Sequence, residues 1–134
     1  MSGKFRHIEH TADIGIELRG GTREELFEAA AEAVAELLSD ENPTRRETRE
    51  ISLEGADLES LLVDFLNELI FLASERGWLA GSAGVKLIPG GLRAVLKGGE
   101  LPSGISNEIK AATYHRMNIR KEKGQWLTEV LFDV

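Results

Sequence analysis

The spacing of hydrophobic residues at the start of the chain predicts two strands followed by a helix. Within residues 4–20, the stretch Ile14–Leu18 alternates apolar residues with polar or small ones, which is typical of a half-buried strand. After a pair of glycines the apolar spacing becomes helical, and Thr22 and Glu25 form a capping-box pattern where it begins. We therefore expect two strands over residues 4–20 and a helix over residues 22–38.

The same strand–turn–helix pattern occurs a second time at a constant offset of 35 residues. The stretch Ile51–Gly55 (ISLEG) matches Ile16–Gly20 (IELRG), and Asp57 takes the place of Thr22 as the helix cap. The second helix, expected over Leu58–Glu75, is apolar on all but a narrow edge and should be the central helix of the core. Two units are too few for a solenoid, and they indicate two similar helices side by side on one sheet.

The chain after residue 78 lacks helical spacing and predicts strands joined by turns. Glycine-containing turns are expected at residues 89–91, 98–99 and 122–124. Between and after these turns, we expect a long strand over Glu108–Arg120 and a final strand over Trp126–Val134.

Together these elements predict an α+β fold with one domain over residues 1–134. We expect two strand–turn–helix repeats, with two helices packed on a mixed, largely antiparallel sheet in which the repeat strands lie near each other. The polar stretch Asp40–Arg49 should be an exposed loop. The positions expected to be mostly buried are Leu26, Phe27, Val34, Leu61, Phe65 and Leu69.

Composition narrows the classes of partner. The net charge of −7 disfavours direct nucleic-acid binding and favours a basic protein partner. The sequence has no cysteine, so neither disulfides nor thiolate metal sites can form. We find no apolar run of about 20 residues and no apolar leader at the N-terminus, so we expect a cytoplasmic protein without a membrane partner.

The stretch between the first two strands is the strongest candidate for chemistry. A corner at His10-Thr11-Ala12-Asp13 would push the Asp13 carboxylate into solvent. The alternative is a plain turn aspartate that bonds only to the backbone. If the chain ends at Val134, Asp133 and the terminal carboxylate add two further anions. Three such oxygen donors would suit calcium, magnesium or manganese, although an acidic strand end can also be merely solvated.

Other candidates are weaker. Asp64 and Glu68 share one helix face, where they form either a metal or acid–base pair or a solvated edge. His7, His10 and His115 could form a three-histidine zinc site, but they lack the spacing of a familiar zinc motif, so scattered, partly buried histidines are the simpler interpretation. The sequence contains no Gly-x-Ser-x-Gly elbow for nucleophilic catalysis.

A further candidate lies in the stretch Glu108–His115. Strand alternation would place Glu108 and Lys110 on one face. Lys110 is then either a free cation beside a phosphate or carboxylate, or an ordinary surface lysine paired with Glu108.

Four stretches, in this order along nearly the whole chain, resemble the archease family. They are His10-Thr11-Ala12-Asp13, Asp64–Leu69, Glu108–His115 and Phe132-Asp133-Val134. The resemblance implies a small acidic protein that assists the GTP-dependent tRNA-splicing ligase. Such proteins promote guanylylation of the ligase and its multiple turnover, can widen its choice of nucleotide, and are not ligases themselves.

The resemblance also implies a site. Asp13, Asp133 and Val134 would hold a divalent metal, with calcium expected ahead of magnesium or manganese. Lys110, in a Lys-Ala-x-Thr-Tyr motif, and His10 would serve activation of the ligase, and no residue would be catalytic.

The resemblance also allows an acidic residue after the first helix, here Asp40, although the loop that holds it differs in length from the family's. Whether Asp40, Asp64 or Glu68 joins the metal cluster stays open.

Two rival functions remain. A metal-dependent hydrolase could use the same carboxylates with His10, and it would need a deep pocket around Asp13. A general protein chaperone would need a large exposed apolar patch, whereas the apolar positions here fall at core periods. A ligase activator would instead present a protruding acidic tip.

Overall fold

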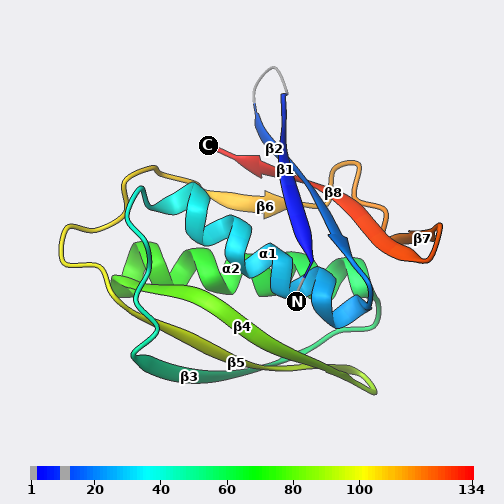
Figure 1. The fold of residues 1–134 in the computed structure, drawn as a ribbon, viewed down its shortest axis with the longest axis horizontal. Helices are drawn as coiled ribbons and strands as arrows, with labels where there is room; N and C mark the ends of the chain where they lie inside the picture. The colour runs from blue at the N-terminus through cyan, green and yellow to red at the C-terminus, as the bar shows by residue number, and fades with distance from the viewer. Residues whose placement is uncertain (1–2, 10–12) are drawn as a thin grey trace.

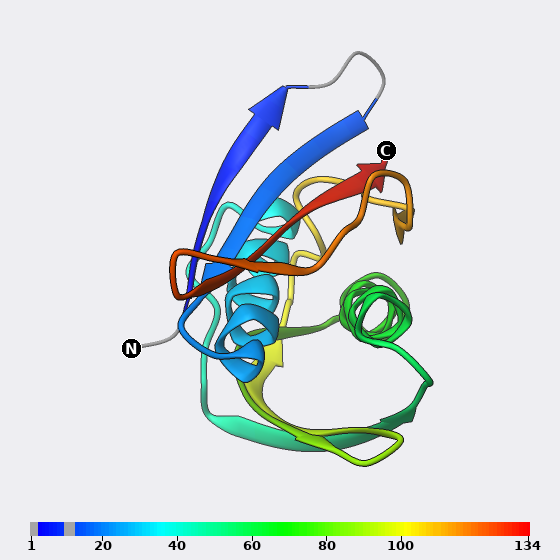
Figure 2. The same cartoon turned by 90° about the vertical axis from the view of Figure 1, so that its right-hand side faces the viewer.

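Two antiparallel sheets enclose two helices in the computed structural model, which describes residues 3–9 and 13–134. Figures 1 and 2 show the helices between the sheets. His10, Thr11 and Ala12, at the predicted corner, lie outside the described residues.

The first sheet has the strand order β1-β2-β8-β6, and β7 pairs with β8 as well. Every pairing in it is antiparallel. The inward residues Ile16 and Leu18 of β2 are fully buried, as the alternation predicted. The strand bounds are β1 Lys4–Glu9, β2 Asp13–Gly20, β6 Ala111–Thr113, β7 Arg120–Glu122 and β8 Gln125–Asp133.

The second sheet has the order β3-β5-β4, and its pairings are also antiparallel. The strands are β3 (Glu47–Glu54), β4 (Trp78–Ile88) and β5 (Gly91–Glu100). The predicted turn at residues 89–91 joins β4 to β5, and Gly90 supplies its left-handed backbone with a φ of 77°.

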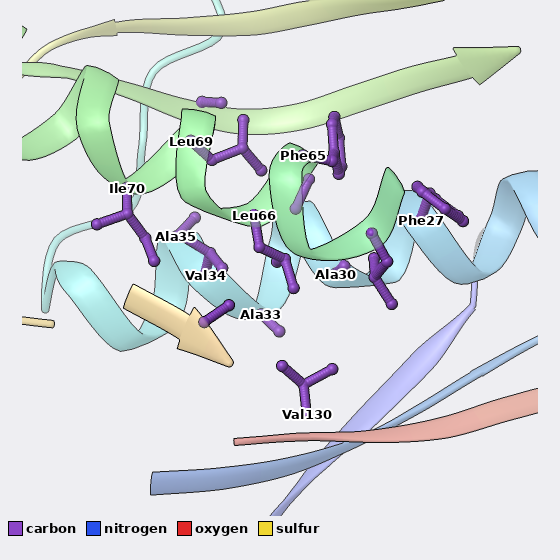
Figure 3. Close-up of a cluster of buried hydrophobic side chains, with 14 of the residues drawn as sticks. Phe27, Ala30, Ala33, Val34, Ala35, Phe65, Leu66, Leu69, Ile70 and Val130 are labelled. Carbon is purple, nitrogen blue, oxygen red and sulfur yellow. The ribbon is translucent and has the colours of Figure 1, made fainter. Parts of the chain in front are cut away.

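The helices α1 (Arg23–Leu38) and α2 (Leu58–Arg76) begin where the sequence predicted. The side chains of Thr22 and Asp57 cap them by accepting hydrogen bonds from backbone N–H groups three residues on. Figure 3 shows apolar side chains of both helices gathered between them, with Val130 of β8 alongside. All six positions predicted to be buried are at most 5% exposed: Leu26, Phe27, Val34, Leu61, Phe65 and Leu69.

The α+β class is confirmed, but the prediction of one sheet was wrong. The repeat strands β2 and β3 lie in different sheets. The physical reason is visible in α1, whose buried residues include Ala29, Ala31 and Ala35 as well as Leu26 and Val34 and therefore surround much of the helix. Such a helix must be covered on more than one side.

The predicted turn at residues 98–99 was also wrong, because both glycines lie within β5. A Cβ atom on Gly98 would stand 2.0 Å from the carbonyl oxygen of Leu79 on β4. This glycine therefore allows close approach of two strands, which a sequence pattern cannot distinguish from a turn.

One predicted strand was too long and another was too short. The stretch Glu108–Arg120 contains the short strand β6 and, at Arg120, the first residue of β7. Between them lies a turn in which the N–H of Met117 donates to the carbonyl of Tyr114. The stretch Glu47–Arg49, predicted as loop, begins β3. The turn at residues 122–124 is confirmed, with left-handed backbone at its second and third residues.

Candidate functional site

The pairing of β2 with β8 places Asp13 directly opposite Asp133. Directly opposed residues of an antiparallel pair point to the same face, with Cβ atoms about 4.5–5.5 Å apart. Because Ile14 and Ile16 lie against the core, Asp13 and Asp133 share the outward face of the sheet. Asp13 is half-buried and Asp133 is exposed.

β6 brings Lys110 to the same end of the sheet. Ala111 pairs with Asp133, and the backbone N–H of Lys110 donates to the carbonyl oxygen of Asp133 at 2.9 Å. The Lys110 side chain is exposed, as is that of Val134. Figures 1 and 2 show the C-terminus beside the start of β2, so residues from both ends of the chain and from β6 meet here.

Two α2 side chains that the sequence analysis missed bond to the backbone between β6 and β7, one of them close to Lys110 and the other at the far end. The Asn67 amide bonds to both backbone polar atoms of Ala112, accepting from its N–H at 2.8 Å and donating to its carbonyl at 3.5 Å. The carboxylate of Glu59 accepts from the N–H of Ile119 at 3.0 Å. The one sequence signal was a polar asparagine in a largely apolar helix, where a partly buried polar group needs a partner.

The carboxylates of Asp13 and Asp133 are the kind of oxygen ligand that a hard cation prefers. They provide only two of the roughly six to eight ligands that calcium usually takes. Oxygen donors such as Asp13 and Asp133 suit calcium, magnesium or manganese. Within residues 3–9 and 13–134, no three histidine, cysteine, aspartate or glutamate side chains gather at a point where they could hold a metal. Further donors would have to come from the carboxylate of Val134, from backbone or from water, so metal binding stays a prediction.

The other candidate ligands are dispersed. Asp64 is exposed and Glu68 half-buried on α2. Asp40 accepts a long hydrogen bond from the amide of Asn107, at 3.5 Å. His7 on β1 and His115 after β6 are exposed, and His10 lies outside the described residues.

An ion-pair cluster occupies the same outward face, further along β2. The Arg6 guanidinium donates to both carboxylate oxygens of Glu17 at 3.1 Å, and Arg19 donates to one of them at 3.0 Å. The hydrogen bond from Arg6 contributes most to lowering the pKa of Glu17, and Arg19 adds to it against the opposing effect of burial. The same pairing raises the pKa of Arg6.

The fold and site define a small α+β protein in which two sheets enclose two helices. Two aspartates from opposite ends of the sequence, Asp13 and Asp133, lie opposite each other on paired strands. A family model, the Archease protein family, matches residues 5–134. The chain belongs to the archease family.

Relatives match over nearly their whole length. The protein archease of Pyrococcus furiosus is 36% identical over 140 residues, covering 98% of this chain and 99% of its own. That of Methanosarcina mazei is 34% identical over 144 residues, covering 98% and 96%.

Two solved structures share the fold. The solution structure of Methanobacterium thermoautotrophicum protein 1598 has a TM-score of 0.76 at 31% identity, covering 97% of this chain and 98% of its own. The crystal structure of an archease, possible chaperone, from Thermotoga maritima has a TM-score of 0.70 at 28% identity, covering 96% of each chain.

Neither helix in the described part of the chain has the length and apolar character needed to cross a membrane.

Proposed function

We propose that this protein activates the GTP-dependent tRNA-splicing ligase, promoting its guanylylation and multiple turnover, and is not itself an enzyme. The observation that supports the proposal is that backbone pairing brings Asp13, Asp133 and Lys110 to one end of the sheet. These residues come from three separate strands or their ends, and together they would form a charged tip. In a member of the archease family, this tip is the feature best suited to reach into a partner's site.

Asp13, Asp133 and Val134 would hold the divalent cation, for which calcium is the first candidate. When bound, the cation offsets the repulsion between the crowded carboxylates and provides a positive centre for phosphate oxygens. The exposed Lys110 ammonium would stabilise negative charge that develops on phosphate during nucleotidyl transfer. The proposed part of His10 in activation stays a prediction, because that residue lies outside the described ranges.

The charge of the whole chain supports a protein partner. A ligase that holds RNA must be basic, and a chain with net charge −7 is attracted to such a surface. Direct nucleic-acid binding by this chain is disfavoured by the same charge.

The rival functions have less support. A chaperone would need a large exposed apolar patch. The exposed large apolar side chains of the described residues are few and lie on separate elements: Phe71, Val95, Tyr114 and Val134. For a hydrolase, a cavity of about 460 Å³ lies between the start of α2 and the β4–β5 turn, lined by Asp57, Leu61 and Gly90 among others. Its lining includes none of Asp13, Lys110 or Asp133.

The test is RNA ligation and ligase guanylylation with and without this protein, in single-turnover and multiple-turnover reactions. The proposal predicts faster guanylylation and many ligations per ligase molecule only when this protein is present. An unchanged ligase, with this protein alone hydrolysing a phosphoester in a metal-dependent way, would favour the hydrolase instead.

A further inference from the structure

β6 is a short strand at the edge of the sheet. It has three residues, Ala111–Thr113, and among the strands of the described residues it pairs with β8 alone. In an antiparallel pair, the backbone polar groups of alternate residues point away from the partner strand. On β6 these groups belong to Ala112, and they face α2, where Asn67 bonds to them.

The Asn67 side chain takes the place of a neighbouring strand at that edge. A carboxamide carries one acceptor oxygen and one donor nitrogen, the same pair of groups as a peptide unit. Asn67 uses both on a single residue, with distances of 2.8 Å at the N–H and 3.5 Å at the carbonyl of Ala112. On its own helix face, Asn67 lies between the buried residues Val63 and Ile70 and the exposed residues Asp64 and Phe71. The half-buried amide therefore sits at the border of the buried face, where it finds its partners on β6.

The same short segment is bonded on its other edge through Lys110. Lys110 lies two residues before Ala112, and its backbone N–H donates to the carbonyl of Asp133 at 2.9 Å. Among the described residues, Lys110 forms no ion pair, and its side chain is exposed. Within residues 3–9 and 13–134, no ion pair or side-chain hydrogen bond fixes the ammonium group, so its location depends on where β6 holds the backbone.

We propose that Asn67 is a positioning residue: by holding the outer edge of β6, it keeps Lys110 beside Asp133 and Asp13. The functional part of this inference rests on the proposed function, because it assigns Lys110 a role in ligase activation. The geometric part does not, and it can be tested on this protein alone.

Glu59 provides a matched control. It lies on the same helix and also accepts a hydrogen bond from a backbone N–H of the β6–β7 segment, that of Ile119. Ile119 lies at the far end of the segment, next to β7 rather than next to Lys110. Glu59→Ala therefore removes a comparable contact between α2 and this segment without touching the edge of β6.

The first measurement is amide hydrogen exchange, followed by NMR, in the wild type, Asn67→Ala, Asn67→Asp and Glu59→Ala. We expect the Lys110 and Ala112 amides to exchange about tenfold faster in Asn67→Ala, while Glu59→Ala leaves both near the wild-type rate. Asn67→Asp keeps the acceptor but loses the donor at neutral pH, so it should fall between the wild type and Asn67→Ala. It also tests the inference if the alanine variant fails to fold. Unchanged Lys110 exchange in the Asn67 variants would overturn the inference.

The second measurement is ligase stimulation by Asn67→Ala, Lys110→Ala and the double variant. If Asn67 acts through Lys110, the maximal stimulation should fall about tenfold in Asn67→Ala, and the double variant should be no worse than Lys110→Ala. Glu59→Ala should stimulate like the wild type. Multiplying effects in the double variant, or an equal loss in Glu59→Ala, would overturn the positioning role. If the wild type itself does not stimulate the ligase, the proposed function fails, and the exchange measurement alone decides the role of Asn67.

Discussion

At the scale of single residues, the backbone of Lys110 contributes to the fold, whereas its side chain does not. Its backbone N–H is part of the structure, through the bond to Asp133, whereas its side chain is exposed and outside every ion pair of the described residues. A substitution that keeps the backbone should therefore affect function and leave the fold intact.

We expect Lys110→Ala to change Tm by at most a few degrees, because removing an exposed side chain costs about 0.5 kcal/mol or less. Ligase stimulation should fall sharply. Calorimetry and the ligation assay measure the two effects separately. Full stimulation by the variant would make Lys110 an ordinary surface residue.

The Glu17 cluster predicts a pH dependence of stability. Because its hydrogen bonds with Arg6 and Arg19 lower the pKa of Glu17 in the folded state, the cluster stabilises the fold above the ordinary glutamate pKa of about 4.3. This contribution is lost as the pH falls through the lowered pKa. Glu17→Gln should therefore lower Tm by about 2–4 °C at pH 7, and the difference from the wild type should shrink below about pH 4. A difference that stays constant between pH 7 and pH 3 would show that the charge of Glu17 is not responsible.

At the scale of elements, the two glycines Gly98 and Gly84 of the second sheet differ in how closely a neighbouring backbone approaches them. Gly98 faces the Leu79 carbonyl of the paired strand, whereas a Cβ on Gly84 of β4 would meet nothing within 4 Å. Both residues lie in strands and neither has a left-handed backbone, so the difference is one of space alone.

We expect Gly98→Ala to destabilise the fold by about 2–3 kcal/mol, because the added methyl group must push β4 and β5 apart. Gly84→Ala should be neutral or slightly stabilising, since it only restricts the unfolded chain. Urea unfolding of both variants measures the free energies. Equal effects would mean that the strands adjust to a side chain at Gly98 without cost.

The spacing of apolar and capping residues along the chain predicts the helices and their buried positions, but not how the strands pair. Buried positions such as Phe27 and Phe65 follow from helical periodicity, and the caps Thr22 and Asp57 follow from residue type and position. Periodicity shows which face of a strand is buried but does not identify its neighbour, and for that reason β2 and β3 were wrongly placed in one sheet. Asn67 was missed because its hydrogen bonds to Ala112 form only when α2 packs beside β6, which the sequence does not show.

At the scale of the whole molecule, the site exists only because the fold brings distant residues together. No local pattern pairs Asp13 with Asp133, and the resemblance to the archease family suggested that they form one site. The register of β2 and β8 now places them opposite each other. The fold cannot supply the identity of the ion or the partner, which depends on chemistry outside the chain.

The site predicts calcium binding that depends on both ends of the chain. Asp13→Ala should weaken calcium binding at least about tenfold, and a residue appended after Val134, which moves the terminal carboxylate away, should also weaken it. Neither change should lower Tm by more than a few degrees without calcium. Isothermal titration with calcium measures the affinity, and Asp64→Ala on α2 serves as a control expected to bind normally. Wild-type affinity in Asp13→Ala would remove Asp13 from the site.

The most direct test of the account is single-turnover guanylylation of the ligase with the wild type, Asp13→Asn, Asp133→Asn and the surface control Asp40→Asn. Asparagine keeps the size of each side chain, removes its charge and replaces one acceptor oxygen with a donor NH2 group. The account predicts that the wild type and Asp40→Asn accelerate guanylylation, whereas Asp13→Asn and Asp133→Asn, folded to the same extent, do not. Equal acceleration by all four proteins would contradict the claim that the paired carboxylates of β2 and β8 form the activating site.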